Sequence, residues 1–286
     1  MEIGYKPTIE RISAEMNRWA KNFIFIILMT GAGYFFGTIC KQIGEFDQLL
    51  IAPSIELLYL LLWILLSLGL MLICAGLVAA LLRPLWVSAI AFLLSGLAML
   101  LGWQVTVVSG VLTFVFVLLG VGYASNVMRG LEKQIDFTVR PISQNQNILL
   151  IGLILVACGS FYIGIRESIA REGFTIPDRY IEFLMEPMEK QFVLRAPEEG
   201  RQEMVIEFRE EFQSFMDGFF DQTLKPYEQY LPLILSGGLF FSIYTVSGLL
   251  TWIPTLFVQA ILTLLTSIGI AKYDFETREV RRLTME

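Results

Sequence analysis

Long stretches without charged side chains dominate the pattern of this chain. Residues 22–40, 57–82, 84–128, 141–165 and 229–271 contain no Asp, Glu, Lys or Arg, and together they make up more than half of the sequence. A helix that crosses a bilayer needs about 20 mainly apolar residues. Two of the stretches are long enough for a pair of spans joined by a tight turn, and the other three are long enough for one span each. The pattern therefore predicts an all-α, polytopic transmembrane helix bundle of about seven spans.

The charged residues divide the chain into five parts. Residues 1–21 predict an amphipathic helix lying in the membrane interface, because apolar residues recur there at steps of three and four with basic residues between them. Residues 22–165 hold the first five spans, with the third at about residues 85–102, the fourth at about 105–124 and the fifth from about Ile148 to residue 165. Residues 166–228 form an acidic, helical extramembrane segment. Residues 229–271 hold the sixth and seventh spans, with a turn expected at Thr251-Trp252-Ile253-Pro254, and residues 272–286 are a charged tail.

The acidic segment carries the sharpest pattern outside the predicted membrane spans. Apolar side chains recur at alternating steps of three and four along one helix, which is a heptad stripe; the stripe consists of Val205, Phe208, Phe212, Phe215 and Phe219. Its polar face is acidic, which disfavours insertion into an anionic lipid surface. The stripe is expected to be covered by protein. Packing within the chain and contact with another chain both remain open.

Small and uncharged polar residues mark two further candidate surfaces within the spans. Gly33 and Gly37 form a small-residue face that lets a second helix approach closely. The polar residues of the last two predicted spans are candidates for a pore lining or for a hydrogen-bonding face between helices; they are Ser242, Thr245, Gln259, Thr263 and Thr266. Gln259, Thr263 and Thr266 share one helical face, and either role would require them to lie between the two helices.

Composition excludes several kinds of chemistry. The chain has no histidine, only three cysteines and no ionisable side chain inside any predicted span. This excludes histidine-dependent metal and triad sites and disfavours proton relays built on buried acids. No phosphate-binding loop, dinucleotide fingerprint or CxxC motif occurs, so we expect no catalytic residues, no metal and no cofactor. The formal net charge of −6 disfavours nucleic acid as a partner.

Two functions remain open from the sequence. The first is a non-enzymatic integral membrane protein that acts as an assembly, scaffold or interaction subunit, with the bilayer, itself or other membrane subunits as partners. The alternative is a passive channel or pore lined by the polar residues of the sixth and seventh spans. Seven spans would place the termini on opposite faces of the membrane, and the basic residues of the short loops favour a cytoplasmic N-terminus.

Overall fold

The computed structural model of the 286-residue chain describes most of the predicted membrane region. The described residues are 6–45, 55–134, 138–172 and 225–268, with Phe208, Glu211, Phe212, Ser214, Phe215, Gly218 and Phe219 from the acidic segment. Within these ranges the side chains of residues 6–21, 56–57, 225–226 and 247–250 are not described.

Six long helices make up the bundle in the described part of the chain. They are α1 (Lys6–Glu45), α2 (Ile55–Leu81), α3 (Leu85–Gly102), α4 (Val107–Glu132), α5 (Arg140–Glu172) and α8 (Leu231–Ser267), and a short 3-10 helix, η2 (Lys225–Tyr230), leads into α8. The start of α4 is fixed by a reciprocal cap. The Ser109 backbone N–H donates to the Thr106 hydroxyl oxygen at 3.1 Å, and the Thr106 backbone N–H donates to the Ser109 hydroxyl oxygen at 2.8 Å.

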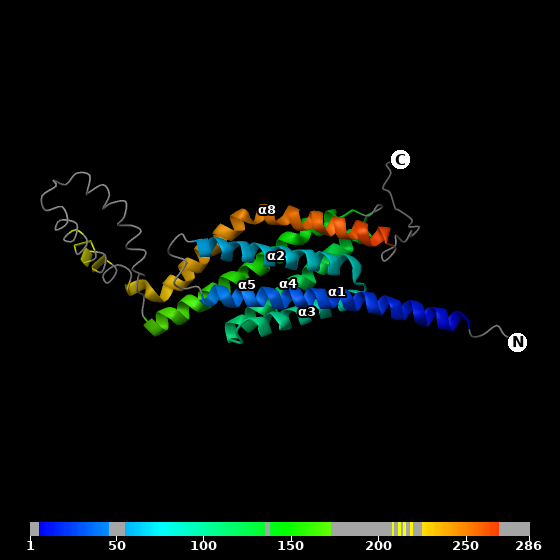
Figure 1. The fold of residues 1–286 in the computed structure, drawn as a ribbon, viewed down its shortest axis with the longest axis horizontal. Coiled ribbons are helices and arrows are strands. Elements are labelled where there is room, and N and C mark those ends of the chain that lie inside the picture. The colour runs from blue at the N-terminus through cyan, green and yellow to red at the C-terminus, as the bar shows by residue number, and fades with distance from the viewer. Residues whose placement is uncertain are drawn as a thin grey trace, which may run out of the picture.

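The helices lie side by side and alternate in direction along the bundle (Figure 1). Helix α5 is central and packs against α1, α2, α4 and α8, while α3 packs mainly on α1 and α4. Helices α2 and α3, although consecutive, hardly touch. The interior is filled by large side chains with no exposed surface, among them Phe36, Phe92, Phe116, Met71 and Leu72. The all-α helix bundle predicted from the sequence is therefore confirmed.

The predicted hairpin of the sixth and seventh spans is wrong. Residues 231–267 form one continuous helix, α8, with Pro254 inside it, so the expected turn at residues 251–254 is not formed. Proline removes a backbone N–H, but membrane helices tolerate this where nearby hydroxyls satisfy the freed carbonyl groups. Beside Pro254, the Thr255 hydroxyl donates to the Thr251 carbonyl oxygen at 2.7 Å, which adds a hydrogen bond next to the carbonyl of residue 250 that the proline leaves without its usual N–H donor. Pro254 alone, with no glycine or charged residue next to it, therefore did not end the helix.

Two other helices are longer than the expected spans. Helix α1 runs without a break from Lys6 to Glu45, so residues 6–21 continue directly into the first span. Helix α5 begins at Arg140, eight residues before the expected start of the fifth span at Ile148, because Pro141 falls in its first turn, where proline fits a helix. It ends at Glu172, beyond the expected boundary at residue 165.

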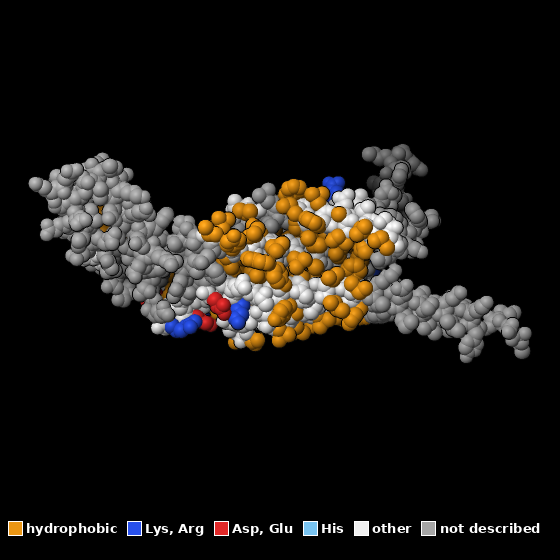
Figure 2. All heavy atoms as spheres, in the orientation of Figure 1, with side chains coloured by type: hydrophobic (Ala, Val, Ile, Leu, Met, Phe, Trp, Pro, Cys, Tyr) orange, Lys and Arg blue, Asp and Glu red, His pale blue; other side chains and the backbone are white. Residues whose placement is uncertain are grey.

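The described part of the chain therefore contains six helices that are long and apolar enough to cross a membrane, which makes the chain compatible with a multi-pass integral membrane protein. With six alternating helices, the first residue of α1 and the last residue of α8 lie toward the same end of the bundle (Figure 1), rather than at opposite ends as seven spans would require. In Figure 2 apolar side chains cover much of the middle of the bundle, and charged side chains gather at the end near the start of α8.

Candidate functional site

The small-residue face of α1 lies in a close contact with α3. A Cβ atom placed on Gly33 would collide with the backbone of Ser95, and one on Gly37 would collide with the backbone of Met99. Helices α1 and α3 run parallel here, since both positions advance by one turn together. From the α3 side, a Cβ on Gly102 would lie 2.5 Å from the Tyr34 carbonyl oxygen. Gly33 and Gly37 thus bring two backbones together without intervening side chains.

Four of the five polar residues of α8 that the sequence singled out as candidates are exposed. Ser242, Thr245, Gln259 and Thr263 are exposed and Thr266 is half-buried. Each hydroxyl donates to the carbonyl oxygen four residues earlier in α8, at 2.7–2.9 Å. Because both expected spans belong to α8, no path between two helices exists at these residues.

Depth in the bundle separates these residues into two groups. A Cβ on Gly76 of α2 would lie 3.0 Å from Val258 and 3.3 Å from Ile142, so these three residues share one level. Ile142 is only two residues from Arg140, where the charge-free part of α5 begins. Gln259, Thr263 and Thr266 therefore lie in the last turns of α8, close to the level where the charge-free part of α5 begins. Ser242 and Thr245 lie about 20–24 Å along the helix from Val258, well away from that level.

The described phenylalanines of the acidic segment form two stacked pairs. Phe208 and Phe212 have ring centroids 6.1 Å apart and are half-buried. Phe215 and Phe219 have centroids 6.4 Å apart, and 66% and 47% of their surfaces are exposed. Val205, the remaining member of the predicted stripe, lies outside the described residues. The cover expected over the stripe is therefore incomplete at Phe215 and Phe219 in this chain.

A polar cleft of about 250 Å³ opens at the end of the bundle where α1, α3 and α5 end. Helix α1 contributes one wall with Lys41 and Glu45, and α5 contributes the other with Glu167 and Arg171. The connection between α3 and α4 adds the buried Trp103 and the half-buried Gln104. The cleft is thus lined by two cationic and two anionic side chains.

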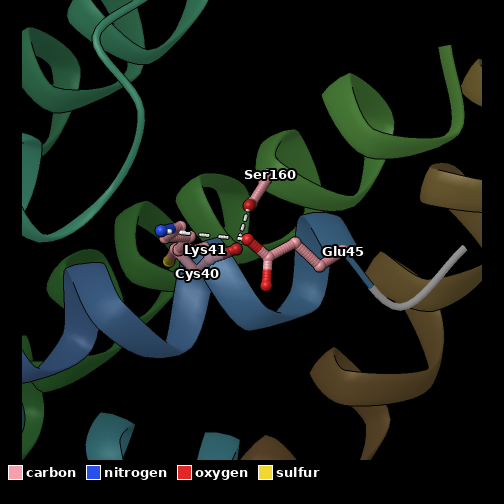
Figure 3. Close-up of polar contacts among 4 residues, drawn as sticks. All are labelled: Cys40, Lys41, Glu45 and Ser160. Carbon is pink, nitrogen blue, oxygen red and sulfur yellow. Dashed lines mark hydrogen bonds and ion pairs between the residues drawn. The ribbon is translucent and has the colours of Figure 1, made fainter. Parts of the chain in front are cut away.

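The floor of the cleft is a rigid contact between α1 and α5. A Cβ on Gly164 would collide with the Gly44 carbonyl oxygen, so the two backbones touch directly. One turn deeper, the buried Ser160 hydroxyl of α5 donates to the Cys40 carbonyl oxygen of α1 (Figure 3). Lys41 and Glu45 lie on α1 beside this hydrogen bond (Figure 3).

The charges of the cleft form only loose ion pairs within their own helices. Lys41 Nζ lies 3.9 Å from Glu45 Oε1, and Arg171 Nη2 lies 3.6 Å from Glu167 Oε2. Charge-assisted hydrogen bonds are usually about 2.7–2.9 Å long. All four side chains are also about half-exposed or more, so they retain capacity to bind a further polar group.

A second polar contact lies between α5 and α8, about one helical turn from the level of Ile142 and Val258. The Thr255 hydroxyl lies 2.9 Å from Gln146 Oε1, and Gln146 is fully buried with no partner for its amide nitrogen. One hydroxyl carries one proton, and Thr255 also donates it to the Thr251 carbonyl oxygen. A rotated Gln146 amide would instead donate N–H to Thr255, which leaves only its oxygen unpaired.

Both the cleft and the contact between Gln146 and Thr255 have signals in the sequence. Gln146 is a polar residue inside a charge-free stretch, but the expected fifth span began after it. The cleft residues are two oppositely charged pairs with i,i+4 spacing, each just beyond the end of a charge-free stretch. Such pairs mark helical turns that continue past the membrane edge.

No metal site could be assembled from the residues present in the described part of the chain, where no group of three or more Cys, Asp or Glu side chains converges. No family model, no curated protein and no solved structure matches this chain.

Proposed function

We propose that this chain is a non-enzymatic assembly subunit of the membrane, and that the outer face of α8 binds a transmembrane helix of a second copy or of another subunit. Gly238, Ser242 and Thr245 follow one another at steps of four and three on this face, and all three are exposed. A Cβ on Gly238 would meet nothing within 4 Å. The same kind of surface on α1 is occupied by α3, whereas on α8 the small-residue face is open.

The energetics of membrane helices support this role. Helices in lipid gain little from burying apolar surface, so they associate where small residues let backbones approach and pack closely. The first half of α8 is the least buried of the candidate spans, with 22% of its most apolar window buried, compared with 72% for α5. Bulky exposed side chains, including Ile234 and Phe241, flank the small residues and could pack around an incoming helix.

Cross-linking at the middle of α8 tests this proposal. Ser242→Cys should form disulfide-linked dimers in membranes if a second copy binds, because the three native cysteines are buried and do not compete. Leu118→Cys is the matched control, since Leu118 is exposed halfway along α4 on a different face. Gly238→Leu should abolish the cross-link, because the leucine side chain would fill the space that a second helix needs beside Gly238.

Size measurement in mild detergent extends the test to other partners. A stable particle larger than one chain, or a membrane protein that co-purifies with the parent and is lost with Gly238→Leu, would support the assembly role. A monomer without partners, together with equal cross-linking at positions 242 and 118, would show that the proposal is wrong.

A passive pore is the second candidate, and one observation favours it. Ser242 and Thr245 are exposed in the first half of α8, so they could line a passage between several chains, although the described interior of one chain is filled by apolar side chains. Solute flux through liposomes that contain only this protein distinguishes the candidates. Flux that falls with Ser242→Leu supports the pore.

A further inference from the structure

We infer that the polar cleft at the end of α1 and α5 binds a phosphate group with a neighbouring ammonium, and that its source is the headgroup of an amine-bearing phospholipid. The cleft is defined by Lys41 and Glu45 on α1, by Glu167 and Arg171 on α5, and by Gln104 between α3 and α4. This site lies apart from the outer face of α8 and does not depend on the assembly role.

The charge of the cleft selects for a ligand that carries both signs. Two cationic and two anionic side chains give no net charge, and each wall presents one of each. A purely anionic ligand would gain from Lys41 and Arg171 but would meet Glu45 and Glu167 at the same short range. A zwitterion can place its phosphate near the cations and its ammonium near the carboxylates.

The hydrogen-bonding capacity of these groups is largely unused. Lysine carries three N–H donors and arginine carries five. Among the residues described, Lys41 makes one ion pair at 3.9 Å, and Arg171 makes one at 3.6 Å and donates its Nε–H to the Glu167 carbonyl oxygen at 3.3 Å. A phosphate would give both cations shorter, charge-assisted contacts.

The position of the cleft fits a lipid headgroup. Lys41 is the first charged residue after the charge-free stretch of α1, and Glu167 follows closely on the end of that of α5. The buried Trp103 is an aromatic residue of the kind enriched at headgroup depth. Gly44 and Gly164 keep the floor clear of side chains, and a volume of about 250 Å³ holds a headgroup but not its acyl chains.

Lipid retention by the full-length protein tests this inference. The protein is purified in mild detergent with matched dioleoyl lipids, either phosphatidylethanolamine or phosphatidylglycerol, and the bound lipid is counted by native mass spectrometry. We expect one phosphatidylethanolamine to be retained roughly tenfold more tightly than phosphatidylglycerol, the effect of about one charged hydrogen bond. Equal retention, or a preference for phosphatidylglycerol, overturns the inference.

Conservative variants assign the binding to the cleft. Lys41→Gln removes the positive charge beside the phosphate and Glu167→Gln removes the negative charge beside the ammonium. Each should abolish the preference while leaving the melting temperature unchanged, because both side chains are solvent-accessible. Lys133→Gln at the opposite end of α4 is the matched control. If both cleft variants retain phosphatidylethanolamine like the parent, the lipid binds elsewhere and the assignment is wrong.

Competition identifies the source of the group. Soluble glycerophosphoethanolamine carries the same phosphate and ammonium without acyl chains. Failure to displace the lipid at a large excess supports a membrane headgroup as the ligand. Displacement at equal concentration would mean that a soluble zwitterion is bound, and the lipid source would be wrong.

Discussion

Two glycines of α1 that differ only in their surroundings show how single residues determine packing. Gly37 lies against the backbone of Met99, while a Cβ on Gly31 would meet nothing within 4 Å. The backbone of a packed helix cannot move aside as a flexible side chain can, so an added methyl group at Gly37 must separate α1 from α3. At Gly31 the same methyl group adds only helix propensity.

Gly37→Ala should therefore destabilise the protein by about 1–3 kcal/mol, as overpacking of a filled interior does. Gly31→Ala should be neutral or stabilising by up to about 1 kcal/mol, since alanine favours helix over glycine. Thermal or denaturant unfolding in one detergent measures both variants. Equal midpoints for the two would contradict the close approach of α1 and α3.

Gln146 and Thr255 are expected to differ in their effect on stability. Gln146 can be replaced by an apolar residue without loss, whereas Thr255 cannot. Gln146→Leu removes a buried amide with an unpaired atom, and Thr255 keeps its bond to the Thr251 carbonyl oxygen. We expect unchanged stability or a gain of about 1 kcal/mol. Thr255→Val leaves the buried amide with no partner at all and should cost about 1 kcal/mol. Unfolding midpoints of both variants decide this, and a large loss from Gln146→Leu would reveal a further partner of the amide.

At the scale of elements, α8 is the helix in which sequence and structure disagree most. Its 37 residues correspond to about 55 Å, compared with a hydrocarbon core of about 30 Å. The helix must therefore tilt across the membrane or project beyond it. The level shared by Val258, Gly76 and Ile142 places the last turns of α8 near one membrane surface.

A single crossing by α8 predicts the sidedness of its ends. Tyr227→Cys and Ser267→Cys lie in exposed positions just before and at the end of α8. An impermeant maleimide should label them from opposite sides of sealed vesicles, and the parent protein should remain unlabelled because its cysteines are buried. Labelling of both from one side would mean that residues 231–267 cross the membrane twice, as the hairpin of two spans required.

Some elements could be predicted because their signal is local. The charge-free stretches gave the positions of α2, α3 and α4 to within a few residues, since a polar or charged residue flanks each end. The Gly33 and Gly37 pattern also indicated a close contact, but the partner α3 depends on long-range packing that spacing does not encode. The prediction of two spans within α8 was wrong. The charge-free stretch 229–271 is long enough for a hairpin, but Pro254, the residue expected to break the helix, is tolerated inside membrane helices.

The candidate sites were harder to predict than the helices. Which polar residues of α8 are exposed depends on which face of the helix packs against α2 and α5, and the helical spacing of residues in the sequence does not determine that face. The exposed ones are Ser242, Thr245, Gln259 and Thr263. The cleft is still less visible in sequence, because its walls come from residues more than 100 positions apart. Only the folded bundle brings Lys41 and Arg171 to one place.

At the scale of the whole molecule, the distribution of charge limits what the bundle can transport. No Asp, Glu, Lys, Arg or His lies within the charge-free stretches, and the ion pairs Lys41–Glu45 and Arg171–Glu167 lie at one end of the bundle. Proton-coupled carriers use ionisable groups within the membrane. The charge-free stretches supply no carboxylate, histidine, lysine or arginine for such a relay.

Any flux supported by the protein should therefore be passive. Liposomes that contain only this chain should show no uphill accumulation of solute when a pH gradient is imposed. A concentration gradient of the solute itself should dissipate only until the inner and outer concentrations are equal. Protein-free liposomes are the control. Accumulation driven by the pH gradient would mean that a coupling group had been overlooked.

The parallel contact between α1 and α3 also has a consequence for biogenesis. The ribosome completes Gly37 about 60 residues before Met99, which corresponds to roughly 3–12 seconds of synthesis. During this time the face of α1 at Gly33 and Gly37 lacks the partner that it has in the folded bundle, because α3 has not yet been synthesised. A nascent chain halted after α2 presents an open helix-binding groove to the lipid, and this intermediate is the one that an insertion chaperone, or a neighbouring nascent chain, would meet first.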